Sequence, residues 1–222
     1  MNLCLLSMLL LTVIFSSIVL VNYKSELQVN TLSAVVLAFL HTIVGVFCVK
    51  AFAGLENLSN PIDAGMSLFG ALFFLPFFYW AGSKITHRDM ALIFDNFCLC
   101  VMIALMFVRC NCIVSGCCQG KVIPNTEMLW PTRQIEIIFW ALVLGLFLYK
   151  KKQGYTKGII YPLMLMLYGV FRFIIEFFRD EKSVLGFFHF GHIWAFLAFI
   201  IGSTIYFSII EYRTICIQRK ND

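Results

Sequence analysis

The sequence predicts an all-α, polytopic membrane protein with about seven transmembrane helices. Hydrophobic residues make up 61% of its 222 residues and charged residues only 13%, and the mean hydropathy is +0.88. A soluble domain usually carries about 25% charged residues, so this composition excludes a soluble protein. Apolar runs of about 20 residues, enough to cross a hydrocarbon core of about 30 Å, follow one another with short polar connectors. We therefore expect one integral membrane domain over residues 1–222.

Seven apolar runs account for most of the chain. They are expected at about residues 3–21, 32–52, 65–80, 91–108, 134–149, 159–178 and 193–210. The first run has no basic residue before it and no small-residue cleavage pattern after it. We therefore interpret it as a retained span and not as a signal peptide. His41, inside the second run, is expected to be a packed core residue.

The distribution of Lys and Arg between the connectors predicts the orientation. With seven spans, the connectors after spans one, three and five and the C-terminal tail share one side, which carries ten Lys and Arg residues against six on the other. The positive-inside rule then places the C-terminus in the cytoplasm and the N-terminus outside. The connector at 109–133 and the end of the sixth span would lie together at the outer leaflet. The net charge of +5 reflects this anchoring, and no nucleic-acid partner is expected.

Tyr168, Arg172, Glu176 and Arg179 form a polar stripe in the sixth span. Spacings of four, four and three residues place them on one face of an α-helix. An arginine in the middle of a bilayer costs about 2.5 to 3.5 kcal/mol, and such groups usually line a cavity or meet a partner. Arg172 and Glu176 could form a structural pair that holds a neighbouring helix. We favour a receptor for an anionic head group, because arginine grips phosphate with two parallel hydrogen bonds.

The connector at 109–133 carries a cluster of cysteines, at positions 110, 112, 117 and 118. A connector of this length is often functional. The ligand type would allow a metal, but the C-x-C-x4-C-C spacing lacks the paired C-x2-C of familiar zinc modules, so we expect neither a metal ion nor a cofactor. An outer-face location favours disulfides, for example between the 110/112 pair and the 117/118 pair. Packing, a metal site and a redox function remain alternatives.

The polar stripe and the cysteine connector together resemble a known family, the prolipoprotein diacylglyceryl transferases. The family's Tyr-Gly-x-x-Arg-Phe-x-x-Glu motif, followed by Arg, is matched by Tyr168, Gly169, Arg172, Phe173, Glu176 and Arg179. In the family's signature after the fourth span, Arg109, Gly116 and Gly120 fall in register. Cys112 stands where an asparagine is expected, and Cys117 where a glutamate is expected.

Two shorter matches extend the resemblance to about residues 60–205. A Pro-Ser/Thr-Gln-Leu-Tyr-Glu motif of the family is matched by Pro131, Thr132 and Glu136, with Arg133 in place of the glutamine. Late in the chain, Gly191-His192 is similar to the family's Gly-Gln pair.

The resemblance implies a seven-span enzyme of the bacterial plasma membrane with its site facing the outer leaflet. The family moves the diacylglyceryl group of phosphatidylglycerol onto the thiol of a lipobox cysteine in a preprolipoprotein and releases glycerol phosphate. The expected partners are therefore phosphatidylglycerol or a similar anionic phospholipid, a preprolipoprotein and the membrane. The expected catalytic residues are Arg172, Arg109, Glu176 and Tyr168. The expected substrate-binding residues are Arg179, Gly120, Gly116, Cys112, Cys117, Glu136 and His192.

The main departure from the family concerns the catalytic base. The family usually has a histidine before two glycines near the third span, and the nearest match here, Phe69-Gly70-Ala71, lacks it. An ordinary cysteine thiol, with a pKa of about 8.5, is mostly protonated at neutral pH, so the acceptor thiol needs a base. Glu176, Tyr168 and His192 are the candidates.

Two further expectations concern the chemistry. The connector cysteines are not expected to be covalent intermediates, because a thioether is a very poor leaving group. The altered connector leaves two alternative functions open: transfer to a different acceptor, or a non-catalytic lipid-binding or thiol-based role in the membrane.

Overall fold

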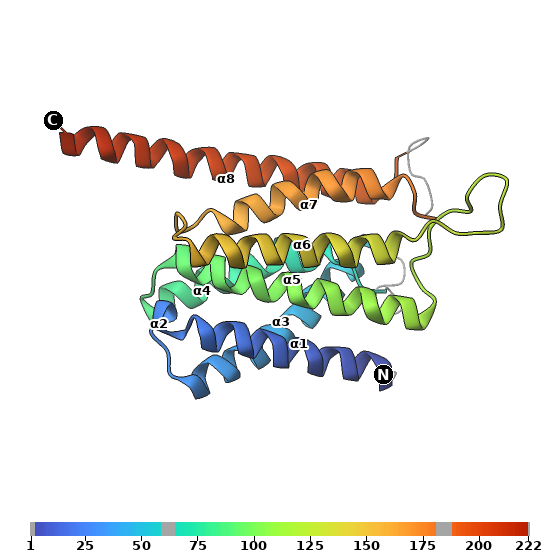
Figure 1. Cartoon of the computed structure of the whole chain (residues 1–222), viewed down its shortest axis with the longest axis horizontal. Helices are drawn as coiled ribbons and strands as arrows, with labels where there is room; N and C mark the ends of the chain where they lie inside the picture. The colour runs from blue at the N-terminus through green and yellow to red at the C-terminus, as the bar shows by residue number, and fades with distance from the viewer. Residues whose placement is uncertain (1–2, 59–64, 181–187, 222) are drawn as a thin grey trace.

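The computed structural model describes residues 3–58, 65–180 and 188–221, and the predicted all-α class is confirmed for them. The helices lie side by side along one long axis, with the N-terminus and the C-terminus toward opposite ends (Figure 1). They are α1 (Leu3–Asn22), α2 (Lys24–Leu27), α3 (Thr31–Glu56), α4 (Phe69–Thr86), α5 (Met90–Ser115), α6 (Thr132–Lys152), α7 (Ile160–Glu176) and α8 (Phe190–Asn221).

Length and composition identify a polytopic membrane protein. Within the described residues, five helices are long and apolar enough to cross a bilayer: α1, α3, α5, α6 and α8 over Phe190–Cys216. α4 and α7 have 18 and 17 residues, and α7 carries the predicted polar stripe. Seven crossings and their orientation therefore remain predictions.

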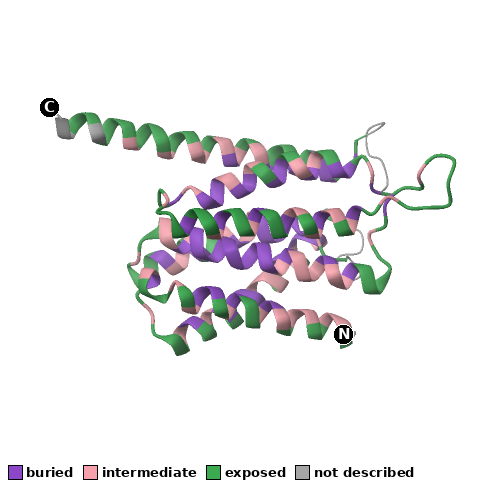
Figure 2. Ribbon diagram, in the orientation of Figure 1, coloured by how far each residue is buried: buried purple, intermediate pink, exposed green. Residues whose placement is uncertain are grey.

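α5 is the centre of the bundle. It packs against α1, α4, α6 and α7, and half of its residues are buried (Figure 2). α7 packs most extensively against α8. A Cβ atom on Gly169 would lie 2.7 Å from the Ala195 carbonyl oxygen, so glycine permits this close approach. The later part of α8 extends beyond the bundle and is mostly exposed (Figure 2).

Several boundaries differ from the sequence prediction. The fourth apolar run was expected to end at 108, but α5 continues to Ser115 and ends where Gly116 adopts a left-handed φ of 69°. No helix breaker precedes that glycine, so Arg109 and Cys112 lie on a helix and not in a connector. α8 likewise continues past 210, and the short α2 was not predicted. His41 is confirmed as a packed core residue, because it is buried and lies 2.8 Å from the Tyr79 hydroxyl.

A buried carboxylate ties the start of α7 to the bundle. Asp95 of α5 accepts hydrogen bonds from the backbone N–H groups of Gly158 (2.5 Å), Ile160 (3.0 Å) and Tyr161 (3.3 Å). The first turn of a helix leaves such groups open, and a negative charge there also meets the positive end of the helix dipole. Asp95 therefore acts as a cap supplied by a neighbouring helix.

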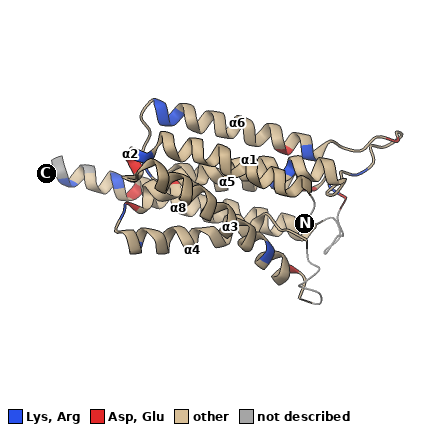
Figure 3. Ribbon diagram, turned by 90° about the horizontal axis from the view of Figure 1, so that it is seen from below, with Lys and Arg blue, Asp and Glu red and all other residues tan. Residues whose placement is uncertain are grey.

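A buried lysine lies beside this cap. Lys151 Nζ is 2.7 Å from Glu26 Oε2 and 2.9 Å from Asn96 Oδ1, and it lies 4.0 Å from the centre of the Tyr23 ring. Asn96 Nδ2 also donates to Glu26, at 3.2 Å. We call Glu26, Asp95, Asn96 and Lys151 the lysine cluster. Charged residues gather toward both ends of the bundle (Figure 3), and this cluster belongs to the end at which α6 finishes.

Candidate functional site

Five charged side chains meet at the opposite end of the bundle, where α5 and α7 finish and α6 begins. Each is at most 5% exposed. They are Arg109 of α5, Glu136 of α6, Arg172 and Glu176 of α7, and Arg179 just beyond α7. We call these residues the arginine cluster. The structure thus brings the connector at 109–133, the start of α6 and the end of α7 together, as the sequence analysis predicted, while the leaflet that they face stays a prediction.

Glu136 is the centre of the arginine cluster. Its Oε2 atom is 2.5 Å from Arg109 Nε, and its Oε1 atom is 3.2 Å from Arg172 Nη1 and 3.4 Å from Arg179 Nη1. One carboxylate on α6 therefore joins arginines from two other parts of the chain. Hydrogen bonds between ionised groups are roughly twice as strong as neutral ones, so the contact fixes all three guanidinium groups.

Glu176 holds the other side of two of these arginines. Its Oε2 atom is 2.8 Å from Arg172 Nη2 and 3.8 Å from Arg179 Nε. The Arg172–Glu176 pair that the sequence suggested as a structural element is therefore present. Because Arg172 also contacts Glu136, the pair is one part of a larger ionic network.

The stripe predicted Arg179 on the same helix as Arg172 and Glu176, and this is wrong. α7 ends at Glu176, so Arg179 lies just beyond the helix. It forms an isolated antiparallel bridge with Gly120, and the neighbouring Lys121 N–H donates to the Phe178 carbonyl at 2.8 Å. The chain beyond α7 is thus held against the connector that follows α5. This pairing keeps the Arg179 side chain buried beside the two glutamates.

Cations converge in the arginine cluster. The guanidinium groups of Arg109, Arg172 and Arg179 lie 2.5 to 3.4 Å from the carboxylate oxygens of Glu136. Guanidinium groups are the usual partners of carboxylate and phosphate groups, which they hold with two parallel hydrogen bonds. The cluster is therefore suited to bind an anion.

Aromatic rings close the inner side of the cluster. Phe69, the nearest match to the family's histidine position, lies with its ring 5.7 Å from the Arg172 guanidinium carbon and 5.7 Å from the Tyr168 ring. Tyr168 also stacks on Trp140 at 5.4 Å. Its hydroxyl oxygen is buried and makes no hydrogen bond within the described chain. At the position that matches the family's histidine, the chain thus has Phe69, whose ring cannot accept a proton.

The two histidines near the start of α8 differ in their surroundings. The His192 ring lies edge-on to Phe173 and Phe177, and its Nδ1 atom accepts a hydrogen bond from the His189 backbone N–H at 3.0 Å. His189 Nδ1 lies 3.8 Å from Glu176 Oε1. His189, which the sequence analysis did not select, is thus the histidine placed at the cluster. Its three-residue spacing from His192 was the available signal.

The glycines selected from sequence meet two different requirements, a left-handed turn at Gly116 and a close approach of neighbouring atoms at Gly120 and Gly191. Gly116 ends α5 in the left-handed conformation. A Cβ atom on Gly120 would lie 2.3 Å from the Trp130 carbonyl oxygen, so only glycine fits there. A Cβ atom on Gly191 would lie 2.5 Å from the Glu176 carboxylate. The start of α8 therefore packs directly against the arginine cluster. A substrate-binding role of Gly116 and Gly120 remains a prediction.

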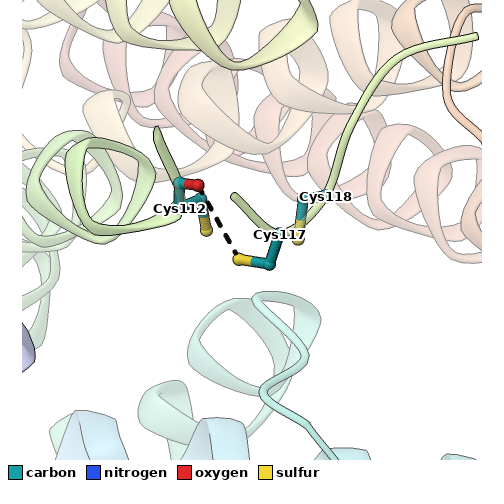
Figure 4. Close-up of side chains that lie close together, drawn as sticks. All are labelled: Cys112, Cys117 and Cys118. Atoms are coloured by element: carbon teal, nitrogen blue, oxygen red, sulfur yellow. Dashed lines mark hydrogen bonds between the residues drawn. The ribbon is translucent and has the colours of Figure 1, made fainter. Parts of the chain in front are cut away.

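Three cysteines lie beside the arginine cluster. All nine cysteines of the chain are free thiols, so the expected disulfide is not present. The sulfur atoms of Cys112, Cys117 and Cys118 lie within 4.8 Å of one another (Figure 4), and Arg109 Nη1 is 4.0 Å from the Cys112 sulfur. The Cys118 thiolate accepts a hydrogen bond from Cys112 and lies near Arg109 and Arg179, which lowers the pKa of the Cys118 thiol to about 5.

Arg133 fixes the backbone around these cysteines. Its Nη1 atom donates to the carbonyl oxygens of Cys112, at 3.0 Å, and Cys117, at 3.2 Å. Sequence reasoning noted Arg133 only as a replacement for glutamine and missed this role. The replacement itself, beside a cysteine-rich connector, was the signal.

Comparison with known proteins agrees with this geometry. A family model described as prolipoprotein diacylglyceryl transferase matches residues 3–208. The phosphatidylglycerol–prolipoprotein diacylglyceryl transferase of Chlorobaculum tepidum is 27% identical over 158 residues, which cover 66% of this chain and 52% of that protein.

Two further relatives carry the same description. The Clostridium tetani protein is 26% identical over 57% of this chain and 55% of its own length. The Acinetobacter baumannii protein is 29% identical over 60% of this chain and 57% of its own length. The chain spans about half the length of the curated relatives that it matches. Since the family model covers the arginine cluster, the cysteine trio and most of the helices, the chain belongs to the prolipoprotein diacylglyceryl transferase family.

Proposed function

We propose that this protein transfers the diacylglyceryl group of phosphatidylglycerol to the thiol of a prolipoprotein cysteine. The observation that carries the proposal is the convergence of three buried guanidinium groups, those of Arg109, Arg172 and Arg179, around Glu136. Guanidinium groups hold the unesterified oxygens of a phosphodiester with two parallel hydrogen bonds, so such a cluster suits a phospholipid head group. The relatives' printed names supply the identity of the lipid and the acceptor.

Arg109 and Arg172 are proposed to hold the phosphate. The acceptor sulfur attacks the glycerol carbon that is bonded to the phosphate oxygen, so an S–C bond forms and the C–O bond breaks. The electron pair goes to the phosphate oxygen, and glycerol phosphate leaves. Fixed cations in a water-poor site stabilise the charge that develops there, an effect that is commonly worth about 10²- to 10³-fold in rate per donor. Glu136 and Glu176 hold these arginines in place before the lipid binds.

The site is proposed to face the outer leaflet of the cytoplasmic membrane in a protein of seven spans. α6 begins with Thr132 at the end with the arginine cluster and finishes with Lys150, Lys151 and Lys152 at the other. The positive-inside rule places such a lysine run in the cytoplasm. This orientation would put the arginine cluster where a secreted acceptor arrives.

The transferase proposal is tested with labelled diacylglycerol. The purified full chain is given phosphatidylglycerol with a labelled diacylglyceryl group and a lipobox peptide, with Arg172→Ala and Arg172→Lys alongside. Arg213→Ala serves as the matched control, because Arg213 is on the outer part of α8, away from the cluster. We expect labelled peptide with the native protein and the control only.

A second outcome would favour the non-catalytic alternative. Phe69 lies beside Arg172 and cannot accept a proton. This observation favours the alternative, because transfer needs a base for the acceptor thiol. Binding of phosphatidylglycerol that depends on Arg172, with no transfer to a lipobox peptide or a small thiol, would assign the protein a lipid-binding role. Transfer to the small thiol alone would point to a different acceptor.

A further inference from the structure

The cysteine trio beside the arginine cluster has the dimensions of a metal site. Zn–S bonds of about 2.3 Å in a tetrahedral site separate the sulfurs by about 3.8 Å. A disulfide needs about 2.05 Å. Cys112, Cys117 and Cys118 keep their sulfur atoms within 4.8 Å of one another, on two segments that face each other (Figure 4). Shifts of about 1 Å or less in the side chains would bring all three onto one ion.

The backbone is shaped to form this trio. Cys112 lies on the last turns of α5, and the left-handed Gly116 turns the chain back toward it. Cys118 itself has a positive φ of 57°, which few residues other than glycine adopt. Such conformations persist where the surrounding structure enforces them, often at functional sites. The two hydrogen bonds from Arg133 to the carbonyls of Cys112 and Cys117 provide that enforcement.

Neighbouring charges favour thiolates around a divalent ion. Three thiolates and one Zn²⁺ carry a net negative charge, which needs a cation nearby. Arg109 is 4.0 Å from the Cys112 sulfur, and the chain at Arg179 pairs with Gly120, two residues after Cys118. Arg109 is thus shared between the cysteine trio and the proposed phosphate position.

The ligand number leaves one position open. Among the described residues, the cluster contains three potential ligands and no fourth His, Cys, Asp or Glu. Zinc sites with three protein ligands keep a fourth, exchangeable position for water or substrate, whereas purely structural sites are closed. Cys117 is exposed, so an outside group can reach this side of the trio.

We propose that Cys112, Cys117 and Cys118 bind one Zn²⁺, and that its open position binds and activates the acceptor thiol. The second half rests on the proposed transferase function. A thiol that coordinates such an ion is deprotonated. The S–H proton passes to solvent, the sulfur forms the S–C bond, and the C–O bond breaks with its electron pair going to the phosphate oxygen. Nothing is oxidised or reduced, and the thioether product is a weaker ligand that leaves.

Metal binding is tested first, without any activity assay. The metal-free full chain, kept reduced with a phosphine, is titrated with Co²⁺ as a spectroscopic substitute and then with Zn²⁺. We expect one Co²⁺ per chain with sulfur-to-metal charge-transfer absorption, displaced by one Zn²⁺. Changing Cys112, Cys117 or Cys118 singly to Ser should weaken affinity by more than about 100-fold, beyond the usual cost of losing a supporting residue.

Cys110→Ser is the matched control, because Cys110 lies on α5 one turn or less from the trio's Cys112 but outside the trio. It should bind Co²⁺ like the native protein. Alkylation of the native protein gives a readout that does not depend on how the variants fold: Zn²⁺ should protect Cys112, Cys117 and Cys118 and not Cys110. Absence of saturable Co²⁺ binding, or equal binding by Cys118→Ser, overturns the metal site.

Thiol activation is tested on the Co²⁺ form. A lipobox peptide with its cysteine should increase the charge-transfer absorption, and the same peptide with serine should not. Removing the metal should abolish transfer, and Zn²⁺ should restore it. If the peptide thiol changes the spectrum but no lipid is transferred, the proposed transferase function is wrong and the thiol-binding metal site is supported. Undiminished transfer by the metal-free protein, lost in His189→Gln, would assign proton removal to His189 and overturn the activation.

Discussion

Two buried ionic clusters at opposite ends of the bundle are built differently. Asp95 and Arg109 are both on α5, and their separation of 14 positions places the clusters about 21 Å apart along the helix. In the lysine cluster, Lys151 meets Glu26 and Asn96, and Asp95 meets three backbone N–H groups. In the arginine cluster, three guanidinium groups converge on Glu136, and Glu176 contacts Arg172 from the other side.

The difference indicates why we propose a ligand for only one cluster. In the lysine cluster, one amine lies beside Glu26, whose side chain is 32% exposed, and Asp95 caps a helix. In the arginine cluster, three guanidinium groups that are at most 5% exposed, and that suit bidentate contact with phosphate, converge on Glu136. A buried charge alone therefore does not identify a binding site, whereas converging guanidinium groups support one.

The largest effect is expected from Arg172→Lys. Lysine keeps the positive charge but cannot contact Glu136 and Glu176 with two nitrogens of one planar group, nor hold a phosphate with two parallel hydrogen bonds. Transfer of labelled diacylglyceryl should fall by about 10²- to 10³-fold. The thermal unfolding temperature should change little. Full activity in the lysine variant would show that the guanidinium geometry is not needed.

Asp95→Ala is the corresponding change at the other end. It leaves three backbone N–H groups at the start of α7 without their acceptor, so the free energy of unfolding should fall by about 3 kcal/mol. The protein that remains folded should retain its transfer rate. Unfolding is measured by titrating a denaturing detergent, and Asp95→Asn should lose less. A loss of activity in folded Asp95→Ala would contradict the division between the clusters.

Paired substitutions test whether the lysine cluster and the arginine cluster differ in role. Lys151→Met alone leaves Glu26 without its partner and should cost about 1 to 2 kcal/mol. Adding Glu26→Gln should recover most of this loss, because replacing both members of an ion pair is often nearly neutral. The double change Arg172→Met with Glu176→Gln should not recover lipid binding or transfer, since Glu136 keeps its other arginines. Equal recovery at both ends would mean that both clusters are structural.

The smallest effect concerns the Cys118 thiol of the metal-free protein. Its pKa is lowered to about 5 by the hydrogen bond from Cys112 and by Arg109 and Arg179, so the thiolate should be present at every pH above about 6. The rate of alkylation by iodoacetamide, followed at each cysteine by mass spectrometry, should be nearly constant from pH 6 to about 8 at Cys118. For free cysteine in the same assay, whose thiol has a pKa of about 8.5, it should rise about tenfold per pH unit below that pKa.

The sequence predicted the fold class and the Arg172–Glu176 part of the arginine cluster from local patterns, whereas Arg109 and Glu136 were expected from the family resemblance. Apolar runs give the helices, and spacings of four residues place Tyr168, Arg172 and Glu176 on one face. The contact between Glu136 and three arginines depends on how α5, α6 and α7 pack, which no local spacing reveals. The same holds for His189, whose nearness to Glu176 depends on the packing of α8 against α7.

The cysteine trio could not be predicted from the spacing of its residues. Their spacing did not match a familiar zinc module, so sequence reasoning favoured disulfides. Counting residues could not show that α5 extends through Cys112 and that Gly116 and the left-handed Cys118 fold the connector back. Cys110, adjacent in sequence, is not part of the resulting trio. Helix phase and turn conformation, not spacing alone, decide which thiols meet.

The most direct test of the account is binding of phosphatidylglycerol by the purified protein, measured against phosphatidylcholine by native mass spectrometry. The account predicts a preference for one phosphatidylglycerol molecule in the native protein and in Lys151→Met with Glu26→Gln. It predicts that Arg172→Lys weakens this preference by about tenfold or more, as expected for lost bidentate contact with phosphate. A preference that survives Arg172→Lys, or that disappears with the lysine cluster, would contradict the claim that the arginine cluster is the lipid phosphate site.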